Sequence, residues 1–174
     1  MAATQRLISL APCSQARCVH LTSVRELEGI RNKGYITPNR GGFPDTYPQS
    51  AQSFGRKYGY VSLFDFETPT EVQILLEYHK WVGFFYRHEP VTVLISFNRQ
   101  GLEPKLLPNA TAKERVGYEI PWMPRTEVWY PEPLALSWAT SRILVYPTEP
   151  IQYKVFKLNS DSYKSEIEEV LATI

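Results

Sequence analysis

Several kinds of residue and segment are scarce in this sequence, and each shortage excludes a class of protein. There are only two cysteines, Cys13 and Cys18, so a disulfide-rich secreted scaffold is excluded and two free thiols are expected. The formal net charge is +1, which provides no global attraction to nucleic acid. No stretch approaches the roughly 20 apolar residues of a membrane span, and the N-terminal residues lack the apolar core of a signal peptide. We therefore expect a soluble, cytoplasmic protein with no membrane partner.

The signature motifs of common nucleotide-binding and metal-binding classes are also missing. The sequence contains neither GxGxxG nor GxxxxGK[ST], so neither a Rossmann site nor a P-loop is indicated. His79 and His88 do not have the spacing of metal ligands on one helix face. A serine-hydrolase elbow is absent as well. We expect no metal site.

Aromatic residues and prolines are abundant. Aromatic residues make up 13% of the chain and there are 14 prolines, which favours strands and shaped loops over a helical bundle. A chain of 174 residues is expected to form a single domain, residues 1–174, with a substantial core.

The first half of the sequence predicts two helices and a long loop. A strand over residues 17–22 leads into a helix, which Ser23 and Glu26 begin through a capping box and Gly34 ends. Residues 36–57 are rich in Gly, Pro, Ser and Asn, which indicates a functional loop. An aromatic strand is predicted over residues 58–66, and a second helix starts at Thr68-Pro69. The inward stripe of that helix is predicted to be Val72, Leu75, Leu76, His79, Val82 and Phe85.

The second half predicts mostly strands. The apolar run at residues 91–97 is typical of a central strand, and a turn is expected at residues 98–101. Further strands are predicted near 104–107, 125–130, 142–146 and 151–157, followed by a C-terminal helix from Ser160. Helices early and strands late indicate an α+β fold rather than a doubly wound sheet.

Glu127 is the strongest candidate for chemistry. It lies within a strand-like run of β-branched and aromatic residues, where Glu127 and Trp129 point to the face opposite Thr126, Val128 and Tyr130. Burying a carboxylate against the interior of a sheet costs free energy unless the carboxylate is paired or takes part in chemistry. The alternative is that Glu127 is a solvated residue of an edge strand.

A second candidate site lies where the first strand meets the first helix. His20 and Thr22 are placed there beside the free backbone N–H groups of the helix start, which could hold a phosphate or nucleotide. The alternative is a helix cap at Thr22 or Ser23 and a core histidine at His20. Arg40 and Arg56 flank the long loop, and either could meet a ligand phosphate or lie on a solvated rim.

The order of these motifs resembles the ADP-ribosyltransferase superfamily. His20-x-Thr22 and the helix that leads to Gly34 resemble its first motif, and residues 59–66 resemble its second, an aromatic strand facing nicotinamide. Thr126-Glu127-Val128-Trp129, followed by residues 133–136 and 143–145, resembles its third motif, which holds a catalytic glutamate. The branch most similar is the DarT-like toxins that ADP-ribosylate DNA, with RNA 2′-phosphotransferases as more distant relatives.

This resemblance implies a fold, a reaction and a set of site residues. The implied fold has a central, mostly antiparallel split sheet with two early helices and a C-terminal helix. The implied enzyme is an NAD-dependent mono-ADP-ribosyltransferase that uses NAD as its substrate and modifies a protein or nucleic acid. Glu127 is then the catalytic carboxylate, and the NAD-binding residues are His20, Thr22, Arg40, Arg56, Tyr60, Ser62 and Phe64. An antitoxin or an ADP-ribosyl hydrolase is the implied partner.

Two other classes of function remain open on the sequence. One is a non-catalytic module that binds ADP-ribose or nucleic acid. The other is an RNA-directed enzyme, either a 2′-phosphotransferase or a ribonuclease with His20 as its base. The 2′-phosphotransferases rely on basic residues rather than a catalytic glutamate, so Glu127 favours ADP-ribosyl transfer over phosphate removal.

Overall fold

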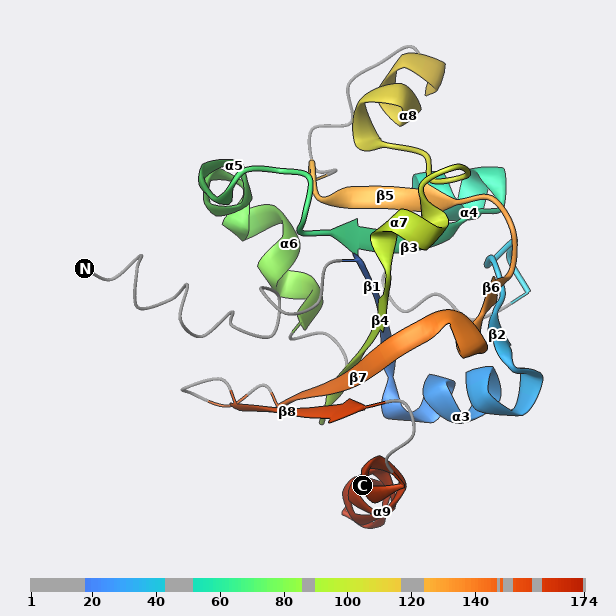
Figure 1. The fold of residues 1–174 in the computed structure, drawn as a ribbon, viewed down its shortest axis with the longest axis vertical. Coiled ribbons are helices and arrows are strands. Elements are labelled where there is room, and N and C mark those ends of the chain that lie inside the picture. The colour runs from blue at the N-terminus through green and yellow to red at the C-terminus, as the bar shows by residue number, and fades with distance from the viewer. Residues whose placement is uncertain are drawn as a thin grey trace.

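The protein is an α+β structure built on an antiparallel sheet (Figure 1). The computed structural model describes residues 18–42, 52–85, 90–116, 124–146, 148, 152–157 and 161–173. The strands are β1 (Cys18–Ser23), β2 (Tyr35–Ile36), β3 (Val61–Asp65), β4 (Thr92–Phe97), β5 (Glu127–Tyr130), β6 (Leu134–Ala135), β7 (Ala139–Tyr146) and β8 (Gln152–Lys157). The helices are α3 (Val24–Lys33), α4 (Phe54–Tyr58), α5 (Glu71–Leu76), α6 (Tyr78–Phe85), α7 (Arg99–Leu102), α8 (Asn109–Val116), α9 (Ser162–Ala172) and the short 3-10 helix η2 (Leu136–Trp138).

The main sheet has six strands in the order β5-β3-β1-β4-β7-β8, and every neighbouring pair is antiparallel. All six residues of β4 are buried, because β1 and β7 flank the strand and both faces of the sheet are covered. This confirms the prediction of a central strand at residues 91–97. A second sheet consists of β2 and β6 alone.

Strands β1 and β3 separate soon after they meet, and this separation creates the space for a site. Their pairing covers only Cys18 with Asp65 and Val19 with Phe64. Beyond those two pairs, β1 continues along β4 for its full length, whereas β3 continues along β5. His20 and Ser62 therefore lie at the point where the two strands diverge.

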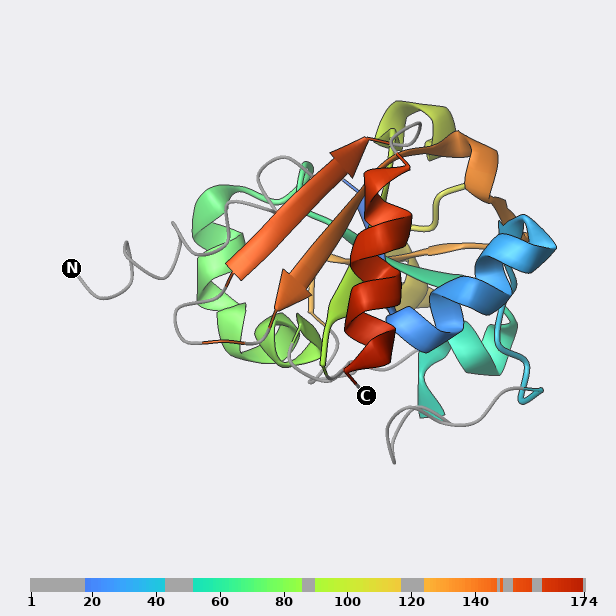
Figure 2. The same ribbon diagram turned by 90° about the horizontal axis from the view of Figure 1, so that it is seen from below.

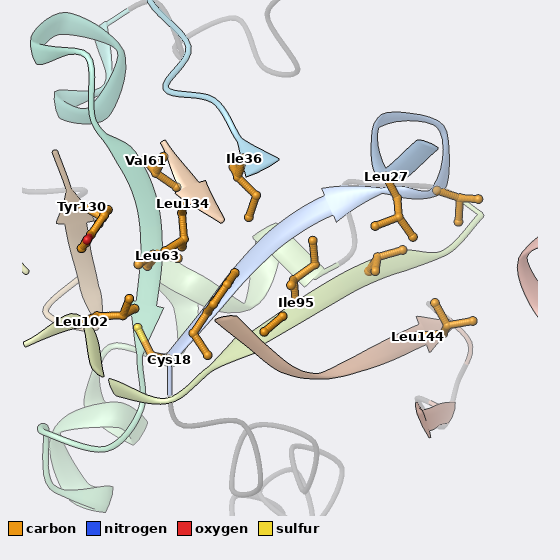
Figure 3. Packing of buried hydrophobic residues seen from close by; sticks show 14 of the residues in the cluster. Cys18, Leu27, Ile36, Val61, Leu63, Ile95, Leu102, Tyr130, Leu134 and Leu144 are labelled. Carbon is orange, nitrogen blue, oxygen red and sulfur yellow. The ribbon is translucent and has the colours of Figure 1, made fainter. Parts of the chain in front are cut away.

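Each face of the sheet has its own apolar cluster. On one face, Leu27 of α3 and Ile36 of β2 pack with residues such as Leu63 and Ile95 (Figure 3), and α9 lies over β7 beside α3 (Figure 2). On the opposite face, Trp81 and Phe85 of α6 cover Val19, Phe64 and Leu94. Residues that alternate along the inner strands supply the two clusters, whereas most residues of β8 are exposed.

The start of the first helix agrees with the sequence prediction. Ser23 is the N-cap of α3; its hydroxyl accepts the N–H of Glu26, whose side chain accepts the N–H of Ser23. Gly34 ends the helix in a left-handed conformation with φ of 76°. These caps satisfy backbone groups that the ends of a helix otherwise leave unpaired, and a cap of this kind is worth about 1 kcal/mol.

The predicted second helix is two helices, and its predicted inward stripe is wrong at three positions, because Val72, Leu76 and His79 are exposed. Thr70 caps α5, which ends at Glu77, and α6 then begins on a new axis. Because of this break, the two helices do not share one continuous inward face. Val72 and Leu76 are 63% and 71% exposed. The core position belongs to Trp81, which is fully buried and donates its indole N–H to Ile74 O at 2.9 Å.

Three further expectations need correction. The region predicted as the loop 36–57 contains Ile36, the last residue of β2, and all of α4 except Tyr58, and Ser53 caps this helix. Residues 99–102, expected as a turn, form α7, because the Asn98 side chain caps it. Residues 104–107 form no strand beyond a single bridge between Leu107 and Trp129, and α8 follows where no element was predicted. Cys13, His88 and residues 43–51 of the loop lie outside the described residues.

Candidate active site

A cavity of about 150 Å³ opens where β1 and β3 diverge. Residues from β1, the segment after β2, α4 and the start of β3 line it: His20, Thr37, Asn39, Ser53, Gly55, Arg56, Tyr60, Val61 and Ser62. Four residues expected at an NAD site, His20, Arg56, Tyr60 and Ser62, thus come together although they are spread over forty positions of sequence. The cavity is smaller than a typical pocket for a whole ligand, so it suits one end of a larger molecule.

Glu127 is joined to the wall of this cavity by one hydrogen bond. The hydroxyl of Ser62 donates to Glu127 Oε1 at 2.7 Å. The two residues lie on neighbouring strands, since Glu127 pairs with Phe64 and Trp129 pairs with Ser62. Side chains opposite each other in an antiparallel pair share a face of the sheet. Glu127, Phe64, Trp129 and Ser62 therefore all point to the same face. The carboxylate is therefore held at a defined place next to the cavity.

The environment of Glu127 changes its acidity. Burial raises the pKa of its carboxyl from 4.5 to about 7, and the hydrogen bond from Ser62 opposes that rise. Trp129 also lowers this pKa, although its indole Nε1 has no hydrogen bond of standard geometry within the described residues. Strand β5 is an edge of the main sheet, as the solvated-edge alternative requires, but the Glu127 residue is half-buried. A carboxyl with a pKa near 7 can exchange protons at neutral pH.

His20 is held by the backbone of the neighbouring strand. Its Nδ1 lies 3.0 Å from Ser62 O, and because a carbonyl oxygen only accepts, Nδ1 carries the proton. In a neutral ring Nε2 is then an acceptor, suited to a hydroxyl such as that of a ribose. His20 is half-buried and lines the cavity, so it differs from a fully enclosed core histidine.

Thr22 and Phe64, which the resemblance also placed at the NAD site, do not line the cavity. Thr22 is 2% exposed, and its hydroxyl donates to Glu26 Oε2 at 3.0 Å, next to the helix cap. Phe64 is 5% exposed and packs against Phe66 and Phe84. Tyr60 is the aromatic residue of the cavity wall.

Arg40 and Arg56 lie against two glycines with left-handed backbones. Arg56 lines the cavity, and a Cβ placed on Gly41 would come within 3.6 Å of its Nη2. Arg40 is exposed and lies over Gly59, where a Cβ would come within 2.4 Å of the guanidinium Nε. Arg40 thus lies against Gly59, which joins α4 to β3 and has no room for a larger side chain, whereas Arg56 makes an ordinary contact beside Gly41 in the segment after β2.

We expect Gly59→Ala to destabilise the protein and to displace Arg40. At a φ of 71° an alanine is strained by about 1 kcal/mol, and its methyl group collides with Arg40. The melting temperature should fall by at least about 2–4 °C. The control is Gly29→Ala, because Gly29 lies inside α3 with nothing within 4 Å of an added Cβ. An equal or higher melting temperature for Gly59→Ala would contradict the packing described for Arg40.

The sequence analysis missed five lining residues, Thr37, Asn39, Ser53, Gly55 and Val61. A signal for one of them exists, because Ser53 stands three positions before Arg56 and its hydroxyl accepts the Arg56 N–H. The helix it starts has only five residues, too short to show a period.

A second cavity, of about 360 Å³, adjoins the first at Tyr60. Its other walls come from the segment after α7, from α8 and from the residue after β5: Pro104, Lys105, Leu106, Leu107, Arg115 and Pro131. Tyr60 therefore belongs to the walls of both cavities.

Over the described ranges, no group of three or more His, Cys, Asp and Glu residues could hold a metal ion. Within the same ranges, no helix has the length and apolar character needed to cross a membrane. No family model matches the chain, and neither a curated protein nor a solved structure matches it.

Proposed function

We propose that the protein is an NAD-dependent mono-ADP-ribosyltransferase that acts on a macromolecular acceptor in the cytoplasm. The observation that carries the proposal is the 2.7 Å hydrogen bond between Ser62 and Glu127, at the wall of a cavity that also contains His20, Arg56 and Tyr60. A carboxyl of raised pKa, hydrogen-bonded to the wall of a cavity that cationic and aromatic residues also line, is a typical arrangement for catalysis.

The divergence of β1 and β3 supports the finer description of the fold as an ADP-ribosyltransferase-like split sheet. A split exposes polar groups of the two separating strands, and here His20 of β1 and Ser62 of β3 line the cavity. The early helices α3 and α5–α6 and the C-terminal helix α9 are compatible with that description.

The reaction needs a group that stabilises positive charge. NAD supplies an ADP-ribosyl group, whose bond from ribose C1 to nicotinamide breaks with the electron pair leaving on nicotinamide. Positive charge develops at C1, as in the cleavage of a glycoside, and the ionised Glu127 carboxylate stabilises it. As the acceptor oxygen or nitrogen bonds to C1, Glu127 takes its proton. Ser62 holds the carboxylate in place through its hydroxyl.

The remaining residues of the cavity have roles that suit their chemistry. Tyr60 offers an aromatic face to the cationic nicotinamide ring. Arg56 offers a guanidinium to the pyrophosphate, with Arg40 on the outer side of Gly59. His20 offers Nε2 as an acceptor to a ribose hydroxyl. Thr22 acts indirectly, since its hydroxyl bonds to Glu26 and supports the helix start.

Saturating NAD is expected to raise the melting temperature of the protein, and His20→Ala is expected to reduce that rise. A ligand at a hundred times its dissociation constant stabilises the folded state by about 2.7 kcal/mol, which corresponds to a rise of several degrees. The control is His79→Ala, because His79 is exposed on α6, away from the cavity. If NAD produces no shift in the wild type, or if His20→Ala leaves the shift unchanged, the assignment of the cavity to NAD is wrong.

The other functions differ from this one in what happens to labelled NAD. A glycohydrolase would release labelled ADP-ribose, and a binding module would produce no turnover. An RNA 2′-phosphotransferase or a ribonuclease would change RNA, but its RNA product would carry no label from NAD. If transfer to an acceptor is observed, an antitoxin or an ADP-ribosyl hydrolase is the partner that this activity requires in its host cell.

A further inference from the structure

The second cavity has the position expected of a neighbouring substrate site. Tyr60 belongs to the walls of both cavities, and its hydroxyl is 3.4 Å from Arg115 Nη1, a long and weak hydrogen bond. A molecule in one cavity and a molecule in the other would therefore both lie against Tyr60. A transferase must hold two substrates side by side, and one cavity of about 150 Å³ does not provide for both.

Four of the seven described residues that line the second cavity are apolar, and Tyr60, Lys105 and Arg115 are the other three. Pro104, Leu106, Leu107 and Pro131 form its apolar walls. Lys105 is neutralised, since its Nζ lies 2.7 Å from Glu132 Oε2. Arg115 is exposed at the end of α8. An occupant that matches these walls has an apolar body and one negative charge.

The charges around this cavity are mixed, which disfavours a polyanion. Glu114 is exposed beside Arg115 on α8, and Glu132 is half-exposed beside Lys105. Binding of nucleic acid depends on several unpaired cations that contact successive phosphates. A single guanidinium over apolar walls instead fits a carboxylate from a protein, next to an apolar or aromatic side chain.

We propose that the second cavity is the docking pocket for the acceptor, and that it receives an acidic and aromatic stretch of a protein. The acceptor carboxylate pairs with Arg115, and the neighbouring apolar side chain contacts Leu106, Leu107 and the two prolines. The role of this pocket in transfer rests on the proposed ADP-ribosyltransferase activity, whereas the docking itself does not.

Docking can be measured directly with a fluorescently labelled random copolymer of glutamate, tyrosine and alanine, in which alanine is in excess so that the negative charges are sparse. Its anisotropy is recorded with the full chain as wild type, Arg115→Ala and Lys113→Ala. Arg115→Ala should weaken binding about tenfold or more, because a charge-assisted hydrogen bond is lost. Lys113→Ala, two positions away on the same helix and outside the pocket, should bind as the wild type does. Equal melting temperatures of the three proteins show that folding is unchanged.

Two results would overturn the proposal. One is equal affinity of the wild type and Arg115→Ala for the copolymer. The other is that a single-stranded oligothymidylate binds more tightly than the copolymer and that Arg115→Ala abolishes the binding of the oligothymidylate. This result would assign the pocket to nucleic acid. NAD turnover by the same proteins separates the two proposals. Wild type that binds the copolymer but turns over no NAD refutes only the transferase activity, and wild type that turns over NAD without binding the copolymer refutes only the docking pocket.

Discussion

Replacing Glu127 by Gln is expected to lower the turnover of NAD on the order of 10²-fold or more while NAD binding is retained. The amide keeps the shape of the side chain and can still accept the Ser62 hydroxyl through its oxygen. It cannot carry the negative charge that stabilises the positive charge at ribose C1. The substitution therefore destabilises the transition state and not the bound substrate. We expect kcat to decrease, with little change in the NAD-induced rise in melting temperature.

Two further variants make this result specific to Glu127. Glu71→Gln removes a carboxylate from the exposed first turn of α5 and should have wild-type turnover. Ser62→Ala removes the hydrogen bond that holds the carboxylate and should produce an intermediate loss of turnover. Wild-type turnover in Glu127→Gln would refute the catalytic role of Glu127.

The same substitution is expected to stabilise the protein at alkaline pH. Burial raises the pKa of Glu127 to about 7 in the folded state, against 4.5 as its ordinary value. The folded state then binds more protons than the unfolded state between these two values, so the free energy of unfolding falls as pH rises from about 4.5 to about 7. The difference amounts to at most about 3 kcal/mol above pH 7. The neutral amide does not titrate and avoids this loss.

This stability effect is measured by melting the wild type and Glu127→Gln at pH 4.5 and pH 8. The two proteins should melt at similar temperatures at pH 4.5, and Glu127→Gln should melt several degrees higher at pH 8. Wild-type turnover should change in the opposite direction, increasing through about pH 7 as the carboxylate ionises. A constant difference in melting temperature across this pH range would show that Glu127 has an ordinary pKa.

Local signals made part of the fold predictable. The capping box of Ser23 and Glu26 and the left-handed glycine at Gly34 involve residues adjacent in sequence, and the structure contains both. The apolar run of β4 requires cover on both faces, and the strand is central. Alternation along β5 placed Glu127 and Trp129 on one face, and the register of β3 with β5 agrees.

The wrong predictions concern elements whose bounds are set by tertiary contacts rather than by the local sequence. Thr68-Pro69 and the apolar residues that follow are compatible with one continuous helix, but the break at Glu77 separates α5 from α6 and leaves Leu76 exposed. The carboxylate of Glu77 accepts the N–H of Arg125 at 2.5 Å, a contact across 48 positions of sequence. No local pattern contains that information.

The candidate site shows the same division between local and long-range information. Glu127, His20 and Ser62 follow from strand positions and from the resemblance of their motifs. The choice between Arg40 and Arg56 could not be made from the sequence, because it depends on how Gly41 and Gly59 approach the guanidinium groups. Arg115 had no signal at all, since α8 was not predicted and its contact with Tyr60 joins distant segments.

The most direct test of the transferase activity is incubation with NAD labelled in its adenylate part, with cell extract as the source of acceptor. We expect the wild type to attach the label to a macromolecule, and Glu127→Gln to attach on the order of 10²-fold less in the same time. Protease or nuclease treatment of the product identifies the acceptor, and protease should release the label. No label on any macromolecule with the wild type, or equal label with Glu127→Gln, would contradict an ADP-ribosyltransferase centred on Glu127.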